Sequence, residues 1–321
     1  MNKRSILILG SAMLAGLVAA VQAQTSWPDR PVKLIVPYPS GGPVDQLARA
    51  IAPRLGEVLG QSVLVDNKAG ASGVIGMDAT IKADPDGYTF GFGVPGGITV
   101  LPHLQKMPYS VDEINYVSLV ARVPQVITVG PKVSANTLQE LMALAKKDPG
   151  AINYGSAGNA TTPHLGAELF AQEAGIKMMH VPYKGAAPAI TALLSGEIQV
   201  LAADLSAVKQ FTSRGVKILA VSASRRSEAI PDVPATAELG LSGVLTESNY
   251  GIIAAKGTPP AITQKMHAAL VTTLQTPDVI GRIAAMGAQP VSTTPEEYRK
   301  LMQQESVRWG AVVKKANIKL D

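Results

Sequence analysis

Short apolar runs alternate with longer helix-like segments near the start of the chain, and this alternation constrains the fold more than any other feature. The runs Val32–Val36, Ser62–Val65 and Tyr88–Phe92 have the length of buried strands, and the segments Val44–Leu59 and Val74–Ala83 between them have a helical period. Parallel strands need helical crossovers, so this order predicts a doubly wound α/β sheet. Functional loops are then expected at the carboxyl ends of the strands.

A second series of the same kind follows. It predicts, in order, strand Gln125–Val129, helix Thr137–Lys147, strand Ile152–Tyr154, helix His164–Ala174, strand Met178–Val181, helix Ala186–Leu194, strand Gln199–Ala203, a short helix ending at Arg214 and strand Lys217–Ser222. A chain of 321 residues is long enough for two such α/β domains with separate cores.

The end of the chain has too few strands for a third domain. It holds one short apolar run, Gly251–Ala254, and three helical stretches, Ala261–Leu274, Val279–Met286 and Pro295–Lys315. We therefore expect this tail to complete the first domain.

The prediction is one lobe of residues 24–123 plus 249–321 and a second lobe of residues 124–248. Two crossovers, near Ala121–Gln125 and Glu247–Gly251, join them. Two lobes joined in this way imply a hinge and a ligand cleft between the lobes. Such a shape suits a binding protein or a bilobal enzyme, and the fold alone does not decide between them.

The first 23 residues have the pattern of a secretory signal peptide. Lys3 and Arg4 precede an apolar stretch from Ile6 to Val21, and small residues flank a cleavage site near Ala23. The alternative is a membrane anchor, but the stretch is shorter than the ~20 residues that span a bilayer. The chain contains no cysteine, which excludes disulfides and a lipidated cysteine at the cleavage site. These features predict an exported, soluble protein.

Composition and motifs argue against several functions. The net charge is only +5 and aromatic residues make up 4%, so nucleic-acid binding is not expected. No Gly-x-Ser-x-Gly motif or Gly-Lys dipeptide occurs, and the four histidines are scattered without metal-ligand spacing. Gly91–Gly96 matches Gly-x-Gly-x-x-Gly, but Pro102 and Pro108 break the helix that a dinucleotide site requires. We predict no catalytic residue, no metal and no cofactor.

Polar, glycine-rich loops follow five of the predicted strands. They are residues 37–45, 67–73, 155–162, 182–188 and 204–206. Several lead directly into helices, whose unpaired N–H groups and positive dipole ends favour an anion. The loops are therefore expected to meet in one cleft and to bind a carboxylate.

Five motifs then resemble those of a known family. They are Trp27–Val32, Pro37–Gly42, Asp84–Thr89, Val181–Gly185 and Gly257–Pro259. In this order they resemble the Bug family of extracytoplasmic solute receptors, the substrate-binding proteins of tripartite tricarboxylate transporters. The resemblance implies an α/β, type II-like periplasmic-binding-protein fold with two crossovers. It also implies that the protein is not an enzyme but a monomer that captures a small mono-, di- or tricarboxylate and delivers it to a permease of one large and one small subunit.

The resemblance also assigns ligand-binding positions. In the first lobe, backbone amides and two ordered waters are expected to hold one carboxylate at Tyr38, Pro39, Ser40, Gly41, Gly42, Asp45, Ala71 and Ser72. In the second lobe, the selective contacts are expected from Ser156, Ala157, Asn159, Thr161, Tyr183, Lys184, Gly185 and Asp204. His164 joins this set because it follows a polar turn at the start of a predicted helix.

Several alternatives remain open at this level. Asp45 could serve only as a helix cap, and Tyr183 or Lys184 could be structural turn residues. Ser156, His164 and Asp204 could instead belong to a secreted bilobal enzyme. A sensory receptor without transport is a third possibility.

The sequence also departs from the family pattern at three places, where it has Asp66-Asn67, Ser72 and Tyr250. The ligand is not specified. Lys184 favours a second acidic group, whereas Asp204 favours an amine or hydroxyl.

Overall fold

Three parallel strands lie side by side in the order β2-β1-β3 and begin the first sheet. The computed structural model describes residues 27–315 and 318, so the predicted signal peptide and its cleavage site lie outside the described residues. The expected alternation is present as β1 (Val32–Val36), α2 (Pro43–Leu59), β2 (Val63–Asn67), α3 (Val74–Ile81) and β3 (Thr89–Gly93). Each loop that follows one of these strands therefore leaves the same edge of the sheet.

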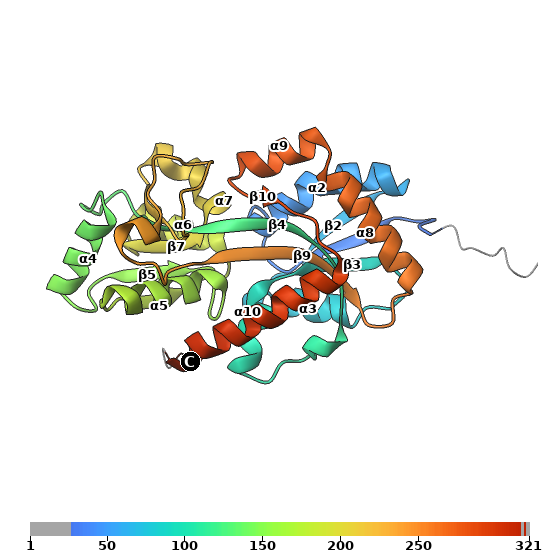
Figure 1. The fold of residues 1–321 in the computed structure, drawn as a ribbon, viewed down its shortest axis with the longest axis horizontal. Helices are drawn as coiled ribbons and strands as arrows, with labels where there is room; N and C mark the ends of the chain where they lie inside the picture. The colour runs from blue at the N-terminus through green and yellow to red at the C-terminus, as the bar shows by residue number, and fades with distance from the viewer. Residues whose placement is uncertain (1–26, 316–317, 319–321) are drawn as a thin grey trace, which may run out of the picture.

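The second sheet has parallel strands in the order β7-β5-β6, flanked by helices (Figure 1). Its elements are α4 (Leu138–Lys147), β5 (Asn153–Ser156), α5 (Thr162–Ala174), β6 (Met179–Pro182), α6 (Ala186–Ser195), β7 (Val200–Asp204), α7 (Leu205–Val208) and β8 (Lys217–Val221). These bounds lie within a few residues of the predicted ones.

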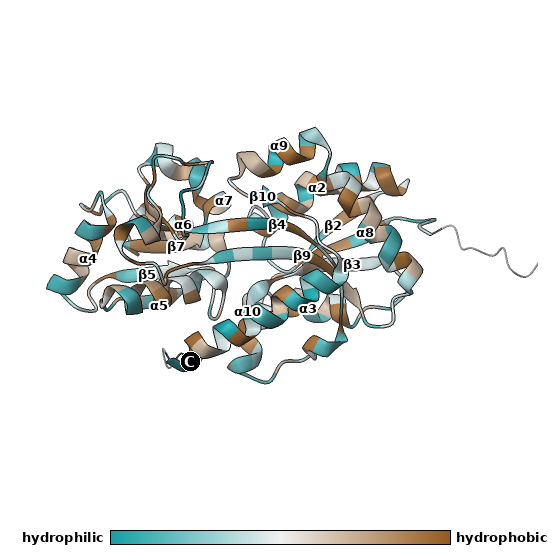
Figure 2. Cartoon of the chain, in the orientation of Figure 1, coloured by the Kyte–Doolittle hydropathy of each residue, from teal (hydrophilic) through white to brown (hydrophobic). Residues whose placement is uncertain are grey.

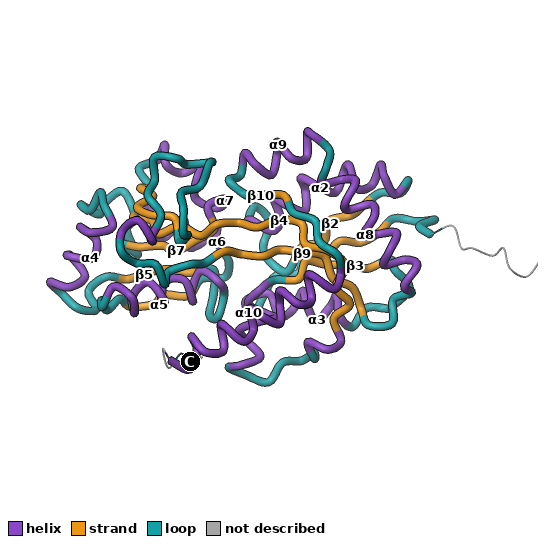
Figure 3. The backbone as a smooth tube through the Cα atoms, in the orientation of Figure 1, coloured by secondary structure: helices purple, strands orange, loops and turns teal. Residues whose placement is uncertain are grey.

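Two long strands pass from one sheet to the other. β4 (Ile114–Val129) begins 11 residues before the predicted strand, and β9 (Glu247–Ala255) pairs antiparallel with it. The first part of β4 pairs with β9, and its last residues pair with β7 and β8. The crossovers are thus a paired two-stranded ribbon, which runs along the middle of the molecule in Figure 3. Because β9 is antiparallel to β3, the first sheet is mixed and not purely parallel.

The tail packs against the first sheet. It consists of α8 (Pro260–Leu274), α9 (Pro277–Ala285), β10 (Gln289–Pro290) and α10 (Pro295–Lys315). Met266, Ile283 and Trp309 from these helices join the same buried cluster as Phe90 and Leu47. Among the described residues, no helix is both long enough and apolar enough to cross a bilayer.

The second sheet is buried on both faces by separate hydrophobic clusters. Ile127 belongs to one cluster and its neighbour Val126 to the other, because successive side chains of a strand point to opposite faces. The outer helices α4 and α10 carry both hydrophilic and hydrophobic residues, as Figure 2 shows. The molecule therefore has two lobes, each built on its own sheet, with β4 and β9 between them.

Candidate functional site

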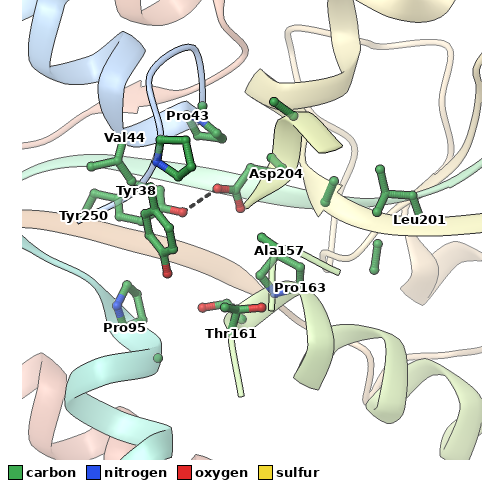
Figure 4. A pocket seen from close by; sticks show the side chains of 18 residues that line it. Tyr38, Pro43, Val44, Pro95, Ala157, Thr161, Pro163, Leu201, Asp204 and Tyr250 are labelled. Atoms are coloured by element: carbon green, nitrogen blue, oxygen red, sulfur yellow. Dashed lines mark hydrogen bonds between the residues drawn. The ribbon is translucent and has the colours of Figure 1, made fainter. Parts of the chain in front are cut away.

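A narrow pocket of about 40 Å³ lies where the two lobes face each other (Figure 4). One wall is formed by Tyr38, Pro39, Gly42, Pro43, Val44, Pro95, Gly96 and Tyr250. The other is formed by Ala157, Thr161, Thr162, Pro163, Ala186, Ala187, Leu201, Ala202, Ala203 and Asp204. Since both lobes contribute, a ligand in this pocket would bridge them.

Part of the residue set expected from the sequence lines this pocket. These residues are Tyr38, Pro39, Gly42, Ala157, Thr161 and Asp204. The remaining expected residues lie outside the lining and are Ser40, Gly41, Asp45, Ala71, Ser72, Ser156, Asn159, His164, Tyr183, Lys184 and Gly185. Of these, Tyr183 donates a hydrogen bond of 2.8 Å to Glu197, and the Lys184 side chain is exposed.

Three helices begin at the pocket without a side-chain cap. They are α2, α5 and α6, which start at Pro43, Thr162 and Ala186. The first amides of a helix have no partner within the helix, and the helix dipole makes this end positive. One of these helix ends belongs to the first lobe and two to the second, so an anion between them would be attracted by both lobes.

The loop after β1 is held in shape by Asp45. This buried carboxylate accepts hydrogen bonds from the Gly41 amide at 2.9 Å, from Arg49 Nε at 2.9 Å and from Asn67 Nδ2 at 3.0 Å. Asn67 Nδ2 also donates to the Tyr38 carbonyl. Burial opposes ionisation of Asp45, but the three hydrogen bonds outweigh it and lower the pKa of this carboxyl. Asp45 therefore supports the wall that carries Tyr38 and does not itself form part of it.

Asp204 ends β7 and joins the pocket to the crossover strands. It accepts hydrogen bonds from Ser248 Oγ at 2.7 Å and Tyr250 Oη at 2.5 Å, both on β9, and from Gln125 Nε2 on β4 at 3.4 Å. Burial raises the pKa of Asp204 to about 6, although these hydrogen bonds act in the opposite direction. Burial and the nearby Asp204 also raise the pKa values of Tyr38 and Tyr250, so both phenols stay uncharged.

The two lobes touch beside the pocket at glycines. A Cβ built on Gly158 would lie 2.7 Å from Oγ of Ser72, and one built on Gly185 would lie 3.1 Å from Cδ of Pro39. Both glycines have positive φ, +134° and +109° respectively. Ser72 and Gly185 thus lie at the contact between the lobes although neither lines the pocket.

The alternative enzyme arrangement is not assembled. Ser156 Oγ lies 2.7 Å from Nε2 of His180, not from His164, and the Ser156 side chain is fully buried. His164 Nδ1 accepts a hydrogen bond from the Ala160 amide, and its ring stacks on His180 at 4.0 Å. Burial and His180 lower the pKa of His164 to about 3, so the ring is neutral near pH 7.

Within residues 27–315 and 318, no three His, Cys, Asp or Glu side chains converge as metal ligands would.

A family model described as the tripartite tricarboxylate transporter family receptor (TctC) matches residues 47–318. The chain belongs to this family. The TctC chain is also 37% identical over 316 residues to protein BugT of Bordetella pertussis, which covers 95% of each chain. The resemblance to the Bug family that the motifs indicated is confirmed.

Solved structures agree with this membership. The structure of periplasmic binding protein BugD has a TM-score of 0.86 and 32% identity, and the match covers 91% of the TctC chain and 99% of BugD. The structure of R. palustris Rpa4515 with adipate has a TM-score of 0.88 and 33% identity, with coverage of 91% and 99%. The predicted two-lobed α/β periplasmic-binding-protein fold is confirmed. TctC proteins are periplasmic solute receptors and not an enzyme family.

Pro95 and Gly96 line the pocket of this TctC receptor but were not expected from the sequence. Ala186 and Ala187 lie in the expected loop 182–188, and Tyr250 was singled out only as a departure from the family pattern. Pro95 and Gly96 follow the carboxyl end of β3, so the rule that selected the other loops also applies to them. Tyr250 lies on the antiparallel strand β9, and no loop signal marks it. Ala186 and Ala187 are apolar side chains whose contribution comes from their position at the start of α6.

Proposed function

We propose that this TctC receptor captures a small carboxylate in the pocket between its lobes and delivers it, as a periplasmic monomer, to a membrane permease of one large and one small subunit. The observation that carries this proposal is the convergence of three uncapped helix N-termini on one pocket. Backbone amides at helix N-termini bind carboxylates without a cationic side chain. The adipate in Rpa4515 supports the same class of ligand.

We further propose that the mobile units are residues 24–123 with 249–321 and residues 124–248. Two buried clusters lie wholly within residues 124–248, which supports this division, although Ala160 and Leu165 of that unit join the cluster of the other one. A ligand that contacts both walls stabilises the closed arrangement, because its contacts exist only when the lobes meet. The loops that carry Ser40, Ala71, Asn159 and Lys184 then form the rim of the cleft.

The first experiment is a thermal-shift screen of residues 24–321 against mono-, di- and tricarboxylates, after unfolding and refolding to remove any co-purified ligand. A ligand at 100 times its Kd should stabilise the folded state by about 2.7 kcal/mol. Neutral amides of the same acids serve as matched controls, because they lack the charge that the helix ends attract. The proposal would be contradicted if no carboxylate in the panel raised Tm. It would also be contradicted if the neutral amides raised Tm as much as the carboxylates.

Solution scattering on the same samples tests whether the two lobes close on the ligand. The radius of gyration should fall when a binding carboxylate is added and should not change with its amide. Unchanged dimensions with a saturating ligand would contradict the hinge closure while leaving binding intact.

A further inference from the structure

The pocket proposed for a carboxylate contains a carboxylate of its own. Asp204 is the one acidic side chain among the described lining residues, and none of these residues is Lys, Arg or His. Positive potential in the pocket therefore comes only from the helix N-termini. The side that carries Asp204 is negative when Asp204 is ionised and neutral when it is protonated. This asymmetry restricts which groups of a ligand can face Asp204.

Asp204 has acceptor capacity left for a ligand. An ionised carboxylate offers about four lone-pair positions. Three donors use them here, Ser248 and Gln125 at Oδ1 and Tyr250 at Oδ2, and the Gln125 contact is long at 3.4 Å. In Figure 4 the carboxylate of Asp204 projects from its strand toward Tyr38 and Tyr250. One more donor, from the ligand, can be accepted on this side.

The groups around Asp204 do not neutralise it. Tyr38 faces it from the loop after β1 and Tyr250 from β9, and both phenols are uncharged because their pKa values are raised. Gln125 on β4 and Ser248 on β9 do not titrate. Among the described residues, the ion pairs found do not include Asp204. A second ligand carboxylate placed against ionised Asp204 would be repelled.

We propose that Asp204 determines specificity by selecting carboxylates that carry a hydroxyl or ammonium donor close to the carboxylate. This inference rests on the proposed function, since it names the ligand class of the same pocket. The carboxylate lies at the helix N-termini of α2, α5 and α6, and the donor bonds to Asp204. The narrowness of the pocket, about 40 Å³, favours ligands in which the two groups lie on neighbouring carbons, as in 2-hydroxy and 2-amino acids.

Two matched ligand series test the proposal by calorimetry at pH 8. Propionate, lactate and alanine differ only in the substituent at carbon 2, and so do succinate, malate and aspartate. Within any series that binds, the hydroxyl or ammonium member should bind about tenfold or more tightly than the unsubstituted acid, which is the usual effect of one hydrogen bond to a charged group.

Asp204→Asn then assigns the preference to this residue. It keeps the side-chain volume and removes the charge, so the advantage of the ammonium member over the unsubstituted acid should fall to within about twofold. Asp278→Asn is the matched control, because it makes the same change at an exposed ion pair with Arg282 on α9, and it should leave the preference unchanged.

The outcomes separate the two proposals. If no member of either series binds and the wider carboxylate panel also fails, the proposed function is wrong. If carboxylates bind but unsubstituted acids bind as tightly as their substituted partners, the role of Asp204 is overturned while carboxylate capture stands. This comparison uses the unmodified protein, so it remains decisive even if Asp204→Asn does not fold.

Discussion

Ser72 and Gly158 meet across the cleft, and a Cβ on Gly158 would lie only 2.7 Å from Oγ of Ser72. The two residues come from loops on different lobes, after β2 and β5 respectively. Glycine at position 158 therefore allows the lobes to approach as closely as they do here. Because φ of Gly158 is +134°, any L side chain at this position is also strained.

Gly158→Ala should weaken binding of every ligand by about tenfold or more, because the clash of the new Cβ with Ser72 costs on the order of 1–3 kcal/mol and exists only in the closed form. Ser72→Ala in the same chain should recover part of this loss, since the Cβ of Ser72 would be 3.5 Å from the new methyl group. Calorimetry on the single and double variants measures both effects. Binding by Gly158→Ala equal to that of the unmodified protein would mean that liganded lobes do not meet here.

Ala187→Asp should have opposite effects on stability and on binding. Ala187 is the second residue of α6 and lines the pocket, so a carboxylate there favours the helix end by about 0.3–1 kcal/mol. The same charge repels an incoming carboxylate and should lower its affinity at least about tenfold. Ala187→Asn has nearly the same size without the charge and serves as the control. Tm without ligand and Kd by calorimetry, compared between the two variants, test the helix-end model.

Asp45→Asn should destabilise the protein by about 1–3 kcal/mol at pH 7, since buried donors lose an ionised partner. The folded-state pKa of Asp45 is lowered below 3.8, so its stabilisation is present above that value and is lost as the pH falls through the folded-state pKa. The difference in urea midpoint between the two proteins should therefore be large at pH 7 and shrink toward pH 3. A difference that stays constant with pH would show that Asp45 acts without its charge.

Asp204→Asn should change stability with the opposite pH dependence. The pKa of Asp204 is raised from 3.8 to about 6 in the folded state, so folding favours the protonated form, and this stabilisation is lost as the pH rises through about 6. Ionisation of Asp204 in the folded state therefore destabilises the unmodified protein by at most about 3 kcal/mol at high pH. Asp204→Asn removes this cost but also loses hydrogen bonds, and that loss offsets part of the gain in stability. The variant should thus gain stability relative to the unmodified protein as the pH rises from 4 to 8, measured as the difference in urea midpoint.

The sequence predicted the strands correctly where they are short and buried on both faces. Val32–Val36 was predicted with the observed bounds because an apolar run between turns leaves few alternatives. The early part of β4 was not predicted, since it contains Asn115 and Ser118. Ser118 is buried and Asn115 is partly buried, and both bond to residues far along the chain: Ser118 donates to the Thr293 carbonyl and Asn115 to Thr263 Oγ1. The local sequence pattern cannot reveal hydrogen-bond partners that lie so far away in the chain.

The site was predictable to the extent that it depends on loops. Tyr38, Gly42 and Thr161 lie in loops that follow strands, Asp204 ends β7, and all four residues line the pocket. Tyr250 could not be placed in this way, because its position depends on the register of β9 against β4, where it pairs with Ala121. That register is a relation between segments more than a hundred residues apart.

The paired crossovers also restrict how the chain can change in evolution. Ser248 and Tyr250 are two residues apart on β9, so their side chains share one face and both reach Asp204. Inserting or deleting a single residue in this ribbon would turn every later side chain to the opposite face and move Tyr250 out of the pocket. We expect descendants of this chain to vary in loop length freely, while the length of β9 between the two lobes is inherited unchanged.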